Sequence, residues 1–333
     1  MGKINLSMIK DISLIIPCQN AETRLNQLLN TISNWEVMPN EIIIVDSSDK
    51  KIDLPEEFIL FTKNFNIKLL VVYEQNLYPG HARNIGISNS KNNLLAFLDT
   101  STFPCVEWLS NGINMIEIDH KDGVWGSTHY QADSFISKIF RACTYGENPI
   151  KTFPGTILKK DVFDRCGLFI ESARAGEDGD WMSRAELQKI NMLLPKRFLR
   201  YEELNYISLK ELIKKWFRNY TFSAKLPFFR AHKDLYYYAI SVFAVLIAFN
   251  WNRVLASWDE ESIFFIPNVT NISILLIFGI YIFMRGILLP CKKGVSLRFI
   301  FPINFIFIAL LSGFLDLTKA LAFGYSKLIR KSF

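Results

Sequence analysis

The sequence predicts an α/β fold with a doubly wound sheet, followed by a membrane region. Three observations support this prediction. Short β-branched runs alternate with amphipathic segments in the first part of the chain, and polar residues follow several of these runs. The last 100 residues carry only 14 charged side chains, whereas the first 233 carry 56. Alternation of strand and helix signals is typical of a sheet covered by helices on both faces.

The strands and helices of the first part follow from the spacing of apolar residues. Residues 12–17 (ISLIIP) form a continuous apolar run that suits a buried strand, and residues 24–35 have helical periodicity. Further elements are expected in the order strand, strand, helix, strand, at residues 41–46, 68–74, 81–90 and 93–99. Ligands bind at the carboxyl ends of the strands in such sheets. Asn20, Glu22, Asp46 and Asp99 lie at or just beyond these ends.

Charge and cysteine content exclude several classes of protein. The first 233 residues contain 29 basic and 27 acidic side chains, a balance that does not favour a nucleic-acid partner. The five cysteines are odd in number and include no C-x-x-C pair, so neither a disulfide framework nor a zinc site is indicated. The first apolar run is too short for a signal peptide. We therefore expect the first part to fold in the cytoplasm.

The last 100 residues contain three long uncharged runs. They cover residues 235–252, 263–284 and 299–315. A membrane span needs about 20 apolar residues, so the first two runs are transmembrane candidates and the third is borderline. A buried core helix is the alternative. The expected organisation is a catalytic domain at 1–207, an amphipathic segment at 208–233 and a membrane region at 234–333.

The segment 208–233 combines apolar residues at helical spacing with seven Lys or Arg and one Glu. We expect a helix in the membrane interface, with its aromatic side toward the acyl chains and its cations toward anionic headgroups. The alternative is an amphipathic helix packed on the soluble domain.

Loop charge predicts the orientation of the membrane region. The basic segment before the first span should be cytoplasmic, the acidic loop at 253–261 outside, and the basic loop at 285–298 cytoplasmic again. This arrangement describes a multi-pass protein of the inner membrane with a cytoplasmic catalytic domain. A third full span would place the basic C-terminal residues outside, against the charge rule. The last segment therefore either turns back within the membrane or violates the rule.

Five motifs carry a resemblance to a known family. In order they are IIPCQNAE, IIIVDSSD, GHARNIGI, AFLDTSTFPCVEWL and RAGEDGDWMSR, within residues 12–218. This series resembles the family 2 glycosyltransferases of the GT-A fold. The resemblance implies an inverting enzyme that uses a nucleotide-sugar and a divalent metal. Membrane members of the family often carry a C-terminal group of helices.

The resemblance implies a nucleotide site. Pro17, Asn20 and Glu22 fall in its first motif, and Asp46 matches the acid that contacts the nucleoside. Arg83 matches an arginine near the nucleotide, where a guanidinium suits base edges and phosphates. The alternatives are a turn or cap for Asp46, a solvated carboxylate for Glu22 and a surface arginine for Arg83.

The resemblance also implies a site for the diphosphate and a metal. The family's Asp-x-Asp motif is written here as Asp99-Thr100-Ser101, so Asp99 and Ser101 are the candidate ligands of Mg²⁺ or Mn²⁺. The alternative is a structural turn in a protein that has lost metal dependence. Trp216 and Arg218 match groups that close over the diphosphate, with attraction to the membrane surface as the alternative.

Asp178 is the predicted catalytic base, and Glu177 the acid that orients Asp178 or the acceptor. An inverting transfer needs a carboxylate to remove the proton of the acceptor hydroxyl. Asp180 and Arg184 stand four residues apart and equally suit a helix-surface pair.

The predicted function is transfer of a sugar from a nucleoside diphosphate to a lipid-linked or glycan acceptor at the cytoplasmic membrane face, in cell-surface polysaccharide or glycolipid synthesis. The alternative is a catalytically degenerate, nucleotide-sugar-binding membrane scaffold. A Rossmann oxidoreductase is disfavoured because no G-x-G-x-x-G follows the first strand. A transporter is disfavoured because the hydrophobic segments are few and none is expected to contain a central charge.

Overall fold

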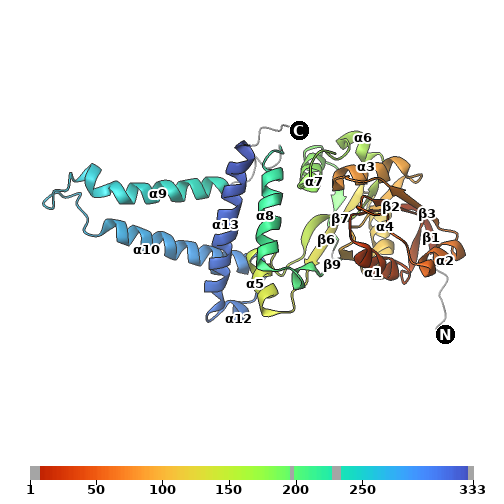
Figure 1. Ribbon diagram of the computed structural model, residues 1–333, viewed down its shortest axis with the longest axis horizontal. Helices are drawn as coiled ribbons and strands as arrows, with labels where there is room; N and C mark the ends of the chain where they lie inside the picture. Colours follow the sequence, from red (N-terminus) through yellow and green to blue (C-terminus); the bar gives the residue numbers. More distant parts are fainter. Residues whose placement is uncertain (1–7, 196–198, 227–233, 329–333) are drawn as a thin grey trace.

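The protein consists of an α/β domain, two helices that lie side by side next to it, and a projecting helical arm (Figure 1). This arrangement comes from a computed structural model, which describes residues 8–195, 199–226 and 234–328.

The strands described form one mixed, nine-stranded sheet. Its path is β3-β2-β1-β4-β7-β6-β9-β5, with β8 paired to β6. The bounds are β1 (Met8–Cys18), β2 (Val37–Asp46), β3 (Lys68–Tyr73), β4 (Leu94–Phe97), β5 (Thr102–Phe103), β6 (Gly123–Tyr130), β7 (Ile150–Lys159), β8 (Met192–Leu193) and β9 (Leu199–Tyr201). Strands β1 to β4 run parallel, whereas β7 is antiparallel to both β4 and β6. The predicted α/β class with a mixed sheet is confirmed.

Helices pack on both faces of the parallel part because alternate residues of each strand point to opposite sides. Leu14 and Ile16 of β1 belong to the core under α1 and α4, whereas Ile15 belongs to the core that contains Ile87 of α3 and Trp181 of α7. The helices of this domain are α1 (Glu22–Ile32), α2 (Glu56–Asn64), α3 (Pro79–Asn89), α4 (Trp108–Ile118), α5 (Phe135–Cys143), α6 (Val162–Cys166) and α7 (Glu177–Leu187).

The second part of the chain is helical. Its elements are α8 (Leu209–Ser223), α9 (Asp234–Leu255), α10 (Val269–Ile282), the π-helical η3 (Phe283–Leu288), α11 (Leu289–Lys292), α12 (Leu297–Ile300) and α13 (Asn304–Leu328). In the part of the chain that the structure describes, two helices are long and apolar enough to cross a membrane, by length and composition alone. They are Val269–Lys292, with a mean hydropathy of 2.3, and Asn304–Leu328, with 1.8. They correspond to the second and third predicted runs, whereas the part of the first run whose side chains the structure describes lies in a shorter apolar helix, Val242–Leu255.

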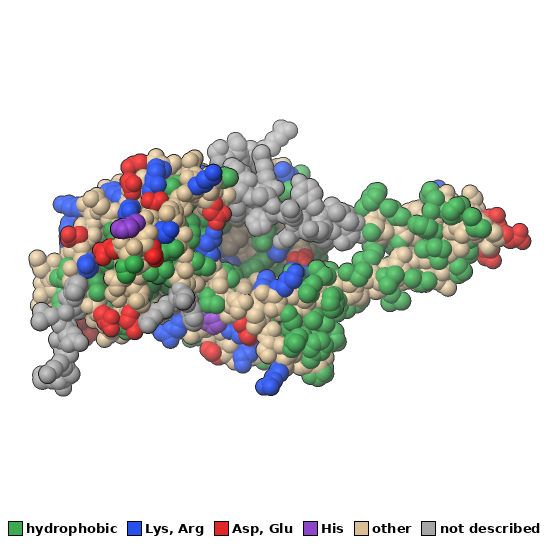
Figure 2. Space-filling model, turned by 180° about the vertical axis from the view of Figure 1, so that it is seen from behind, with side chains coloured by type: hydrophobic (Ala, Val, Ile, Leu, Met, Phe, Trp, Pro, Cys, Tyr) green, Lys and Arg blue, Asp and Glu red, His purple; other side chains and the backbone are tan. Residues whose placement is uncertain are grey.

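Helices α9 and α10 lie side by side and project from the rest of the molecule as an arm (Figure 1). Apolar side chains cover much of the arm, and acidic side chains gather at its far end (Figure 2). The loop between the two helices contains Asp259, Glu260 and Glu261, all exposed. Only 6% of the most apolar 18-residue stretch in Val269–Lys292 is buried.

Helix α8 begins with a capping box, in which the Ser208 hydroxyl accepts from the Glu211 N–H and the Glu211 carboxylate accepts from the Ser208 N–H. Its apolar side contacts α13: Leu212 is 1% exposed, and the rings of Phe217 and Tyr325 lie 5.6 Å apart. The aromatic side that we expected in the bilayer is therefore covered by protein, because α13 returns alongside it. Residues 227–233 of the expected interfacial segment lie outside the described residues.

The expectation that no hydrophobic segment contains a central charge is wrong for α13. This helix runs through Asp316, and the preceding long helix runs through Arg285. Nη2 of Arg285 donates to Oδ1 of Asp316 over 2.6 Å. The two charges thus compensate each other across the helices. Because they are paired, both can lie within otherwise apolar helices.

Candidate active site

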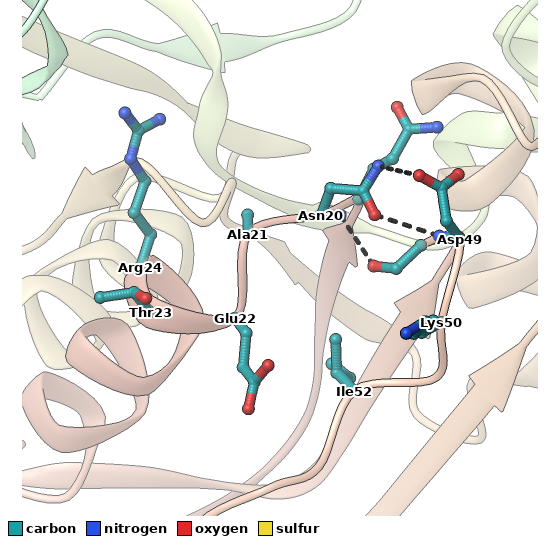
Figure 3. Close-up of a pocket in the computed structure, with 10 residues that line it drawn as sticks. Asn20, Ala21, Glu22, Thr23, Arg24, Asp49, Lys50 and Ile52 are labelled. Carbon is teal, nitrogen blue, oxygen red and sulfur yellow. Dashed lines mark hydrogen bonds between the residues drawn. The ribbon is translucent and has the colours of Figure 1, made fainter.

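Two loops at the carboxyl ends of β1 and β2 line an open pocket of about 760 Å³ (Figure 3). The pocket is lined by Gln19, Asn20, Ala21, Glu22, Thr23, Arg24, Ser48, Asp49, Lys50 and Ile52. Glu22 and Arg24 come from the start of α1, and Lys50 and Ile52 from the loop after β2 (Figure 3). The pocket thus combines carboxylates, cations and amide groups at the sheet edge where ligands are expected.

Asn20 fastens the two loops together. Its Nδ2 donates to Oδ2 of Asp49 over 3.1 Å, its Oδ1 accepts from the Asp49 N–H, and its own N–H donates to the Ser48 hydroxyl over 2.7 Å. Asn20 has a positive φ of 50°, a conformation that asparagine tolerates better than most residues. Asn20 therefore shapes the pocket wall.

Asp46 shapes the same wall from beneath. It is fully buried, and its two carboxylate oxygens accept from the N–H groups of Ser48 and Ile52 over 3.0 and 2.9 Å. Pro17, at the end of β1, is registered against Val45 beside it. In this arrangement the Asp46 carboxylate holds the loop that carries Asp49 and Lys50 toward the pocket.

Arg83 joins two more of the predicted residues. It is 3% exposed on α3, and its Nη1 and Nη2 donate to Oε1 of Glu177 over 2.8 Å and Oδ1 of Asp99 over 3.0 Å. Its guanidinium carbon lies 5.5 Å from the ring centres of both Phe153 and Phe169. Burial lowers the pKa of Arg83, but the negative charges of Asp99, Glu177 and Asp178 outweigh this effect and hold the pKa above its ordinary value.

Glu177 and Asp178 begin α7. Burial, followed by the negative charge of Asp178, raises the pKa of Glu177 above its ordinary range. Asp178 is half-buried, and its Oδ1 accepts from the Gly179 N–H over 2.8 Å. Gly176 allows the turn before them: its φ is 87°, and a Cβ there would lie 2.5 Å from the Ser223 hydroxyl of α8.

Asp180 and Arg184 form an ion pair within α7, four residues apart, but Asp180 is buried and does not lie on the helix surface. Nε of Arg184 donates to Oδ2 of Asp180 over 2.9 Å, and the guanidinium also donates to the carbonyls of Cys166 and Leu168. Trp181 between them is fully buried. These residues fix α7 against the α6 loop, and thereby fix the orientation of its first turn.

In the Asp99–Ser101 turn, the predicted metal site, Asp99 supplies the only carboxylate. Among the described residues no group of three His, Cys, Asp or Glu side chains could hold a metal ion. Asp99 is one-third exposed, with one oxygen on Arg83, and Ser101 follows in the same turn. Magnesium is often held by one or two carboxylates together with substrate phosphates and water, so this donor set fits a metal that binds with its substrate.

Trp216 and Arg218 lie on α8. Trp216 packs edge-on to Tyr145, with ring centres 6.0 Å apart, in the core between α5, α8 and α13. Arg218 is exposed and donates to Oδ1 of Asn219. The structure thus brings together Arg83, Asp99, Glu177 and Asp178, and it brings Asn20 and Glu22 into the pocket, whereas Trp216 serves the helical core.

Sequence reasoning missed Phe153 and Phe169, whose rings enclose Arg83. It also missed Arg24 and Lys50, the cations that line the pocket. Position alone could have indicated Lys50, since it follows the second strand within the VDSSD motif region. No sequence signal pairs the two phenylalanines with an arginine that stands 70 and 86 residues before them.

Comparison with known proteins decides the family. Residues 13–169 match the family model described as "Glycosyl transferase family 2". These residues form a family 2 glycosyltransferase domain. The predicted family and its GT-A type of mixed α/β fold are thereby confirmed. The matched range contains the pocket loops, Arg83 and Asp99, and it ends just before α7.

Curated relatives of this glycosyltransferase domain include glycosyltransferase AglE of Haloferax volcanii, 28% identical over 193 residues, which are 54% of this chain and 62% of AglE. Poly(ribitol-phosphate) β-N-acetylglucosaminyltransferase TarS of Staphylococcus aureus is 22% identical over 56% of this chain and 34% of TarS. The chain thus spans less than two thirds of each relative.

Two solved structures also resemble the chain. Residues 1–349 of S. aureus TarS in complex with UDP-GlcNAc superpose with a TM-score of 0.44 at 17% identity, covering 96% of this chain and 92% of that one. Mannosyltransferase PcManGT of Pyrobaculum calidifontis, in complex with GDP-Man and Mn²⁺, gives a TM-score of 0.49 at 11% identity, covering 96% and 88%.

Proposed function

We propose that this chain is a membrane-anchored inverting glycosyltransferase. It transfers a sugar from a nucleoside diphosphate to a hydroxyl of a lipid-linked or glycan acceptor. The observation that carries the proposal is the chain of side chains Asp99–Arg83–Glu177, which ends beside the half-buried Asp178 at the carboxyl edge of the sheet. This edge belongs to a family 2 glycosyltransferase domain.

The reaction is a single displacement with inversion. The Asp178 carboxylate removes the proton of the acceptor hydroxyl. At the same time the acceptor oxygen forms a bond to the anomeric carbon of the donor sugar. The bond between that carbon and the donor phosphate breaks, and its electron pair leaves with the nucleoside diphosphate. Glu177 lies next to Asp178 and is held by Arg83, so it fixes the first turn of α7 during this step.

The donor occupies the pocket between the β1 and β2 loops and extends toward Asp99. Lys50 and Arg24 supply positive charge at the pocket, and the Asn20–Asp49 bridge keeps its wall in place. Asp99 and the Ser101 hydroxyl are the residues that would hold Mg²⁺ or Mn²⁺ together with the donor. When bound, such a cation neutralises charge on the departing diphosphate.

The arm formed by α9 and α10 anchors the protein in a cytoplasmic (inner) membrane. Its exposed apolar surface and its acidic far end support this assignment (Figure 2). The catalytic domain is cytoplasmic, because the basic residues lie at the base of the arm and the acidic ones at its tip. Anchoring raises the local concentration of a lipid-borne acceptor, which favours a role in cell-surface polysaccharide or glycolipid synthesis.

The test uses the full chain in proteoliposomes. UDP-, GDP- and dTDP-sugars are screened, with and without Mn²⁺, for a shift in thermal unfolding and for release of the nucleoside diphosphate. Asp178→Asn is expected to bind the donor normally and to lose activity by about 10³-fold, within the range for a general base. Glu186→Gln, on the same helix but 58% exposed, is the matched control and keeps its activity.

Near-normal turnover in Asp178→Asn would remove Asp178 as the base. A protein that binds a nucleotide-sugar but neither transfers nor hydrolyses it is a scaffold, which contradicts the proposal. Transfer to short soluble glycans as fast as to polyprenyl-linked acceptors contradicts the lipid acceptor alone.

A further inference from the structure

Helix α13 has two faces of different character. Its buried positions, which include Ile308, Leu311 and Leu315, belong to the core shared with α5 and α8. Its other face is an exposed apolar stripe, with exposed fractions between 46% and 60%. The stripe consists of Phe307, Leu310, Phe314, Leu317 and Leu321.

The stripe follows helical spacing and carries no charge. Its members are three or four residues apart, so they form one continuous line along the helix. A helix on the surface of a soluble protein normally carries charged or polar residues on the face turned away from its core. This stripe is instead wholly apolar, like much of the exposed surface of the arm.

Helix α13 lies crosswise to the arm. In Figure 1, α9 and α10 run away from the molecule, whereas α13 runs across their base with α8 beside it on the side of the catalytic domain. Gly286 of η3 allows close contact at the crossing: a Cβ there would lie 2.4 Å from the Phe305 carbonyl oxygen. The close contact therefore limits how far η3 and α13 can move relative to each other.

A polar cluster holds the crossing. The Tyr281 hydroxyl donates to Oδ2 of Asp316 over 3.0 Å, and Nη2 of Arg285 donates to Oδ1 over 2.6 Å. Lys319 lies 3.5 Å from the same carboxylate and 5.2 Å from the ring centre of Tyr220 on α8. Residues of α10 with η3, of α13 and of α8 are thus linked by ion pairs, a hydrogen bond and a cation–π contact.

We propose that α13 lies in the plane of the membrane surface and inserts its apolar stripe into the headgroup–acyl boundary, while α9 and α10 alone span the bilayer. This proposal rests on the membrane anchoring proposed above. A helix that is crosswise to a spanning pair cannot itself span, although α13 has the length to do so. A large exposed apolar face is the feature by which in-plane helices bind membranes.

The charges agree with this placement. Lys319 and Lys327 of α13 then lie on the same side as Lys292 and Arg298 at the base of the arm. The acidic loop at the tip lies on the opposite side. A spanning α13 would separate Lys327 from the other cations, against the preference for basic residues on the cytoplasmic side.

The placement links the membrane to the active site. Helix α8 rests on α13, and Ser223 at the end of α8 contacts the turn at Gly176, directly before Glu177 and Asp178. The height of Asp178, the proposed base, above the membrane is therefore fixed through α8 and α13.

The test measures depth with nitroxide labels in proteoliposomes. Labels are attached through an incorporated keto amino acid, so that the five native cysteines stay in place. They are placed one at a time at Leu310, Phe314, Leu317 and Leu321. Phe278 on the arm, 54% exposed, is the lipid reference, and Leu187 on the catalytic domain, 79% exposed, is the water reference. Relaxation by oxygen and by a soluble nickel complex gives the depth of each label.

The expected result is one shallow depth at all four stripe positions. A membrane-impermeant dye is expected to reach position 327 from the side of the catalytic domain and position 260 only from the other side. Depths that pass through a maximum in the middle of α13, with position 327 labelled beside position 260, would show that α13 spans. Water exposure of the whole stripe, or its protection by a second copy of the chain, contradicts the proposal when Phe278 is in lipid. Water exposure of Phe278 contradicts the anchoring itself, and neither result bears on the Asp178→Asn test.

Discussion

Arg83 bridges Asp99, which follows the fourth strand, and Glu177, which begins the seventh helix. Both bonds are short, at 3.0 and 2.8 Å, and the arginine is 3% exposed. Arg83 is therefore a positioning residue: it ties the metal candidate to the acid beside the predicted base. A buried charge of this kind is stable only while both partners remain, because an unpaired buried charge is costly.

Replacing Arg83 is expected to weaken both fold and activity. Arg83→Met leaves two carboxylates without their cation, and we expect a loss of about 3–5 kcal/mol in unfolding free energy, typical of a broken buried pair. Arg83→Lys keeps the positive charge but not the planar guanidinium that reaches both carboxylates. We expect it to be more stable than Arg83→Met but to have little more activity. Arg165→Lys, at a surface pair with Asp122, is the control and costs less than about 1 kcal/mol. Equal stability of Arg83→Met and the parent chain contradicts the role.

Ser101→Asp is expected to strengthen the metal dependence. The substitution supplies a second carboxylate in the turn that holds Asp99, and Mg²⁺ and Mn²⁺ bind oxygen ligands of this kind. We expect donor binding to require about tenfold less Mn²⁺. The measurement is a titration of Mn²⁺ at fixed nucleotide-sugar, followed by thermal unfolding. Asp99→Asn is the opposing variant, and a Mn²⁺ response that neither substitution alters would remove the site.

Glu41 is expected to give the fold a pH-dependent contribution. It is 2% exposed, and its carboxylate accepts from the Ser13 hydroxyl, the Lys68 ammonium and the Lys91 N–H. Burial raises its pKa, but these bonds outweigh burial and hold the pKa below the ordinary 4.5. The stabilisation is therefore complete above pH 4.5 and is lost as the pH falls through the lowered pKa.

Glu41→Gln tests that contribution. At pH 7 we expect a loss of about 1–2 kcal/mol, moderated by the exposure of Lys68, in urea unfolding. The difference from the parent chain should shrink as the pH falls below 4.5. Glu57→Gln on α2, an exposed acid, should show no such trend. A constant difference across the acid range contradicts the argument.

Gly176→Ala is expected to disturb the first turn of α7. The new Cβ would meet Ser223 at 2.5 Å in a backbone conformation that side chains disfavour. We expect a cost of about 1–3 kcal/mol and a larger loss of kcat than of donor affinity, since α7 carries Asp178. Gly324→Ala, where nothing lies within 4 Å, is the control. Adding Ser223→Ala should restore part of the activity, because it removes the clash but not the strain.

The strands that end at the site could be predicted because their patterns are local. Ile12–Pro17 and Glu41–Asp46 are short stretches dominated by isoleucine, leucine and valine, and register then brings Cys18 beside Asp46. The contacts of Arg83 could not be predicted, since its partners lie 16 and 94 residues away and no local pattern pairs them. The sequence predicts that Asp46 faces the nucleoside. Its hydrogen bonds to two N–H groups of the following loop could not be predicted, because they depend on the path of that loop.

The helical part shows the same limit. The apolar spacing of residues 208–223 indicated an amphipathic helix but not what would cover its apolar side, and lipid and protein satisfy the same pattern. Asp316 shows why charge alone is a poor boundary: paired with Arg285, it sits in the middle of α13. Such pairing depends on where two distant helices cross.

With α13 at the membrane surface as proposed, the stacking of α8 on α13 sets the height of the turn at Gly176 above the membrane. Each helix is about 10–12 Å across with its side chains, so two layers hold the turn at Gly176 roughly 20 Å above the outer surface of α13. With Asp178 as the proposed base and α13 at the membrane surface as proposed, we expect that an acceptor whose hydroxyl stands much lower or much higher than that does not reach Asp178. The number of sugars already present on a lipid carrier would then decide whether it is extended.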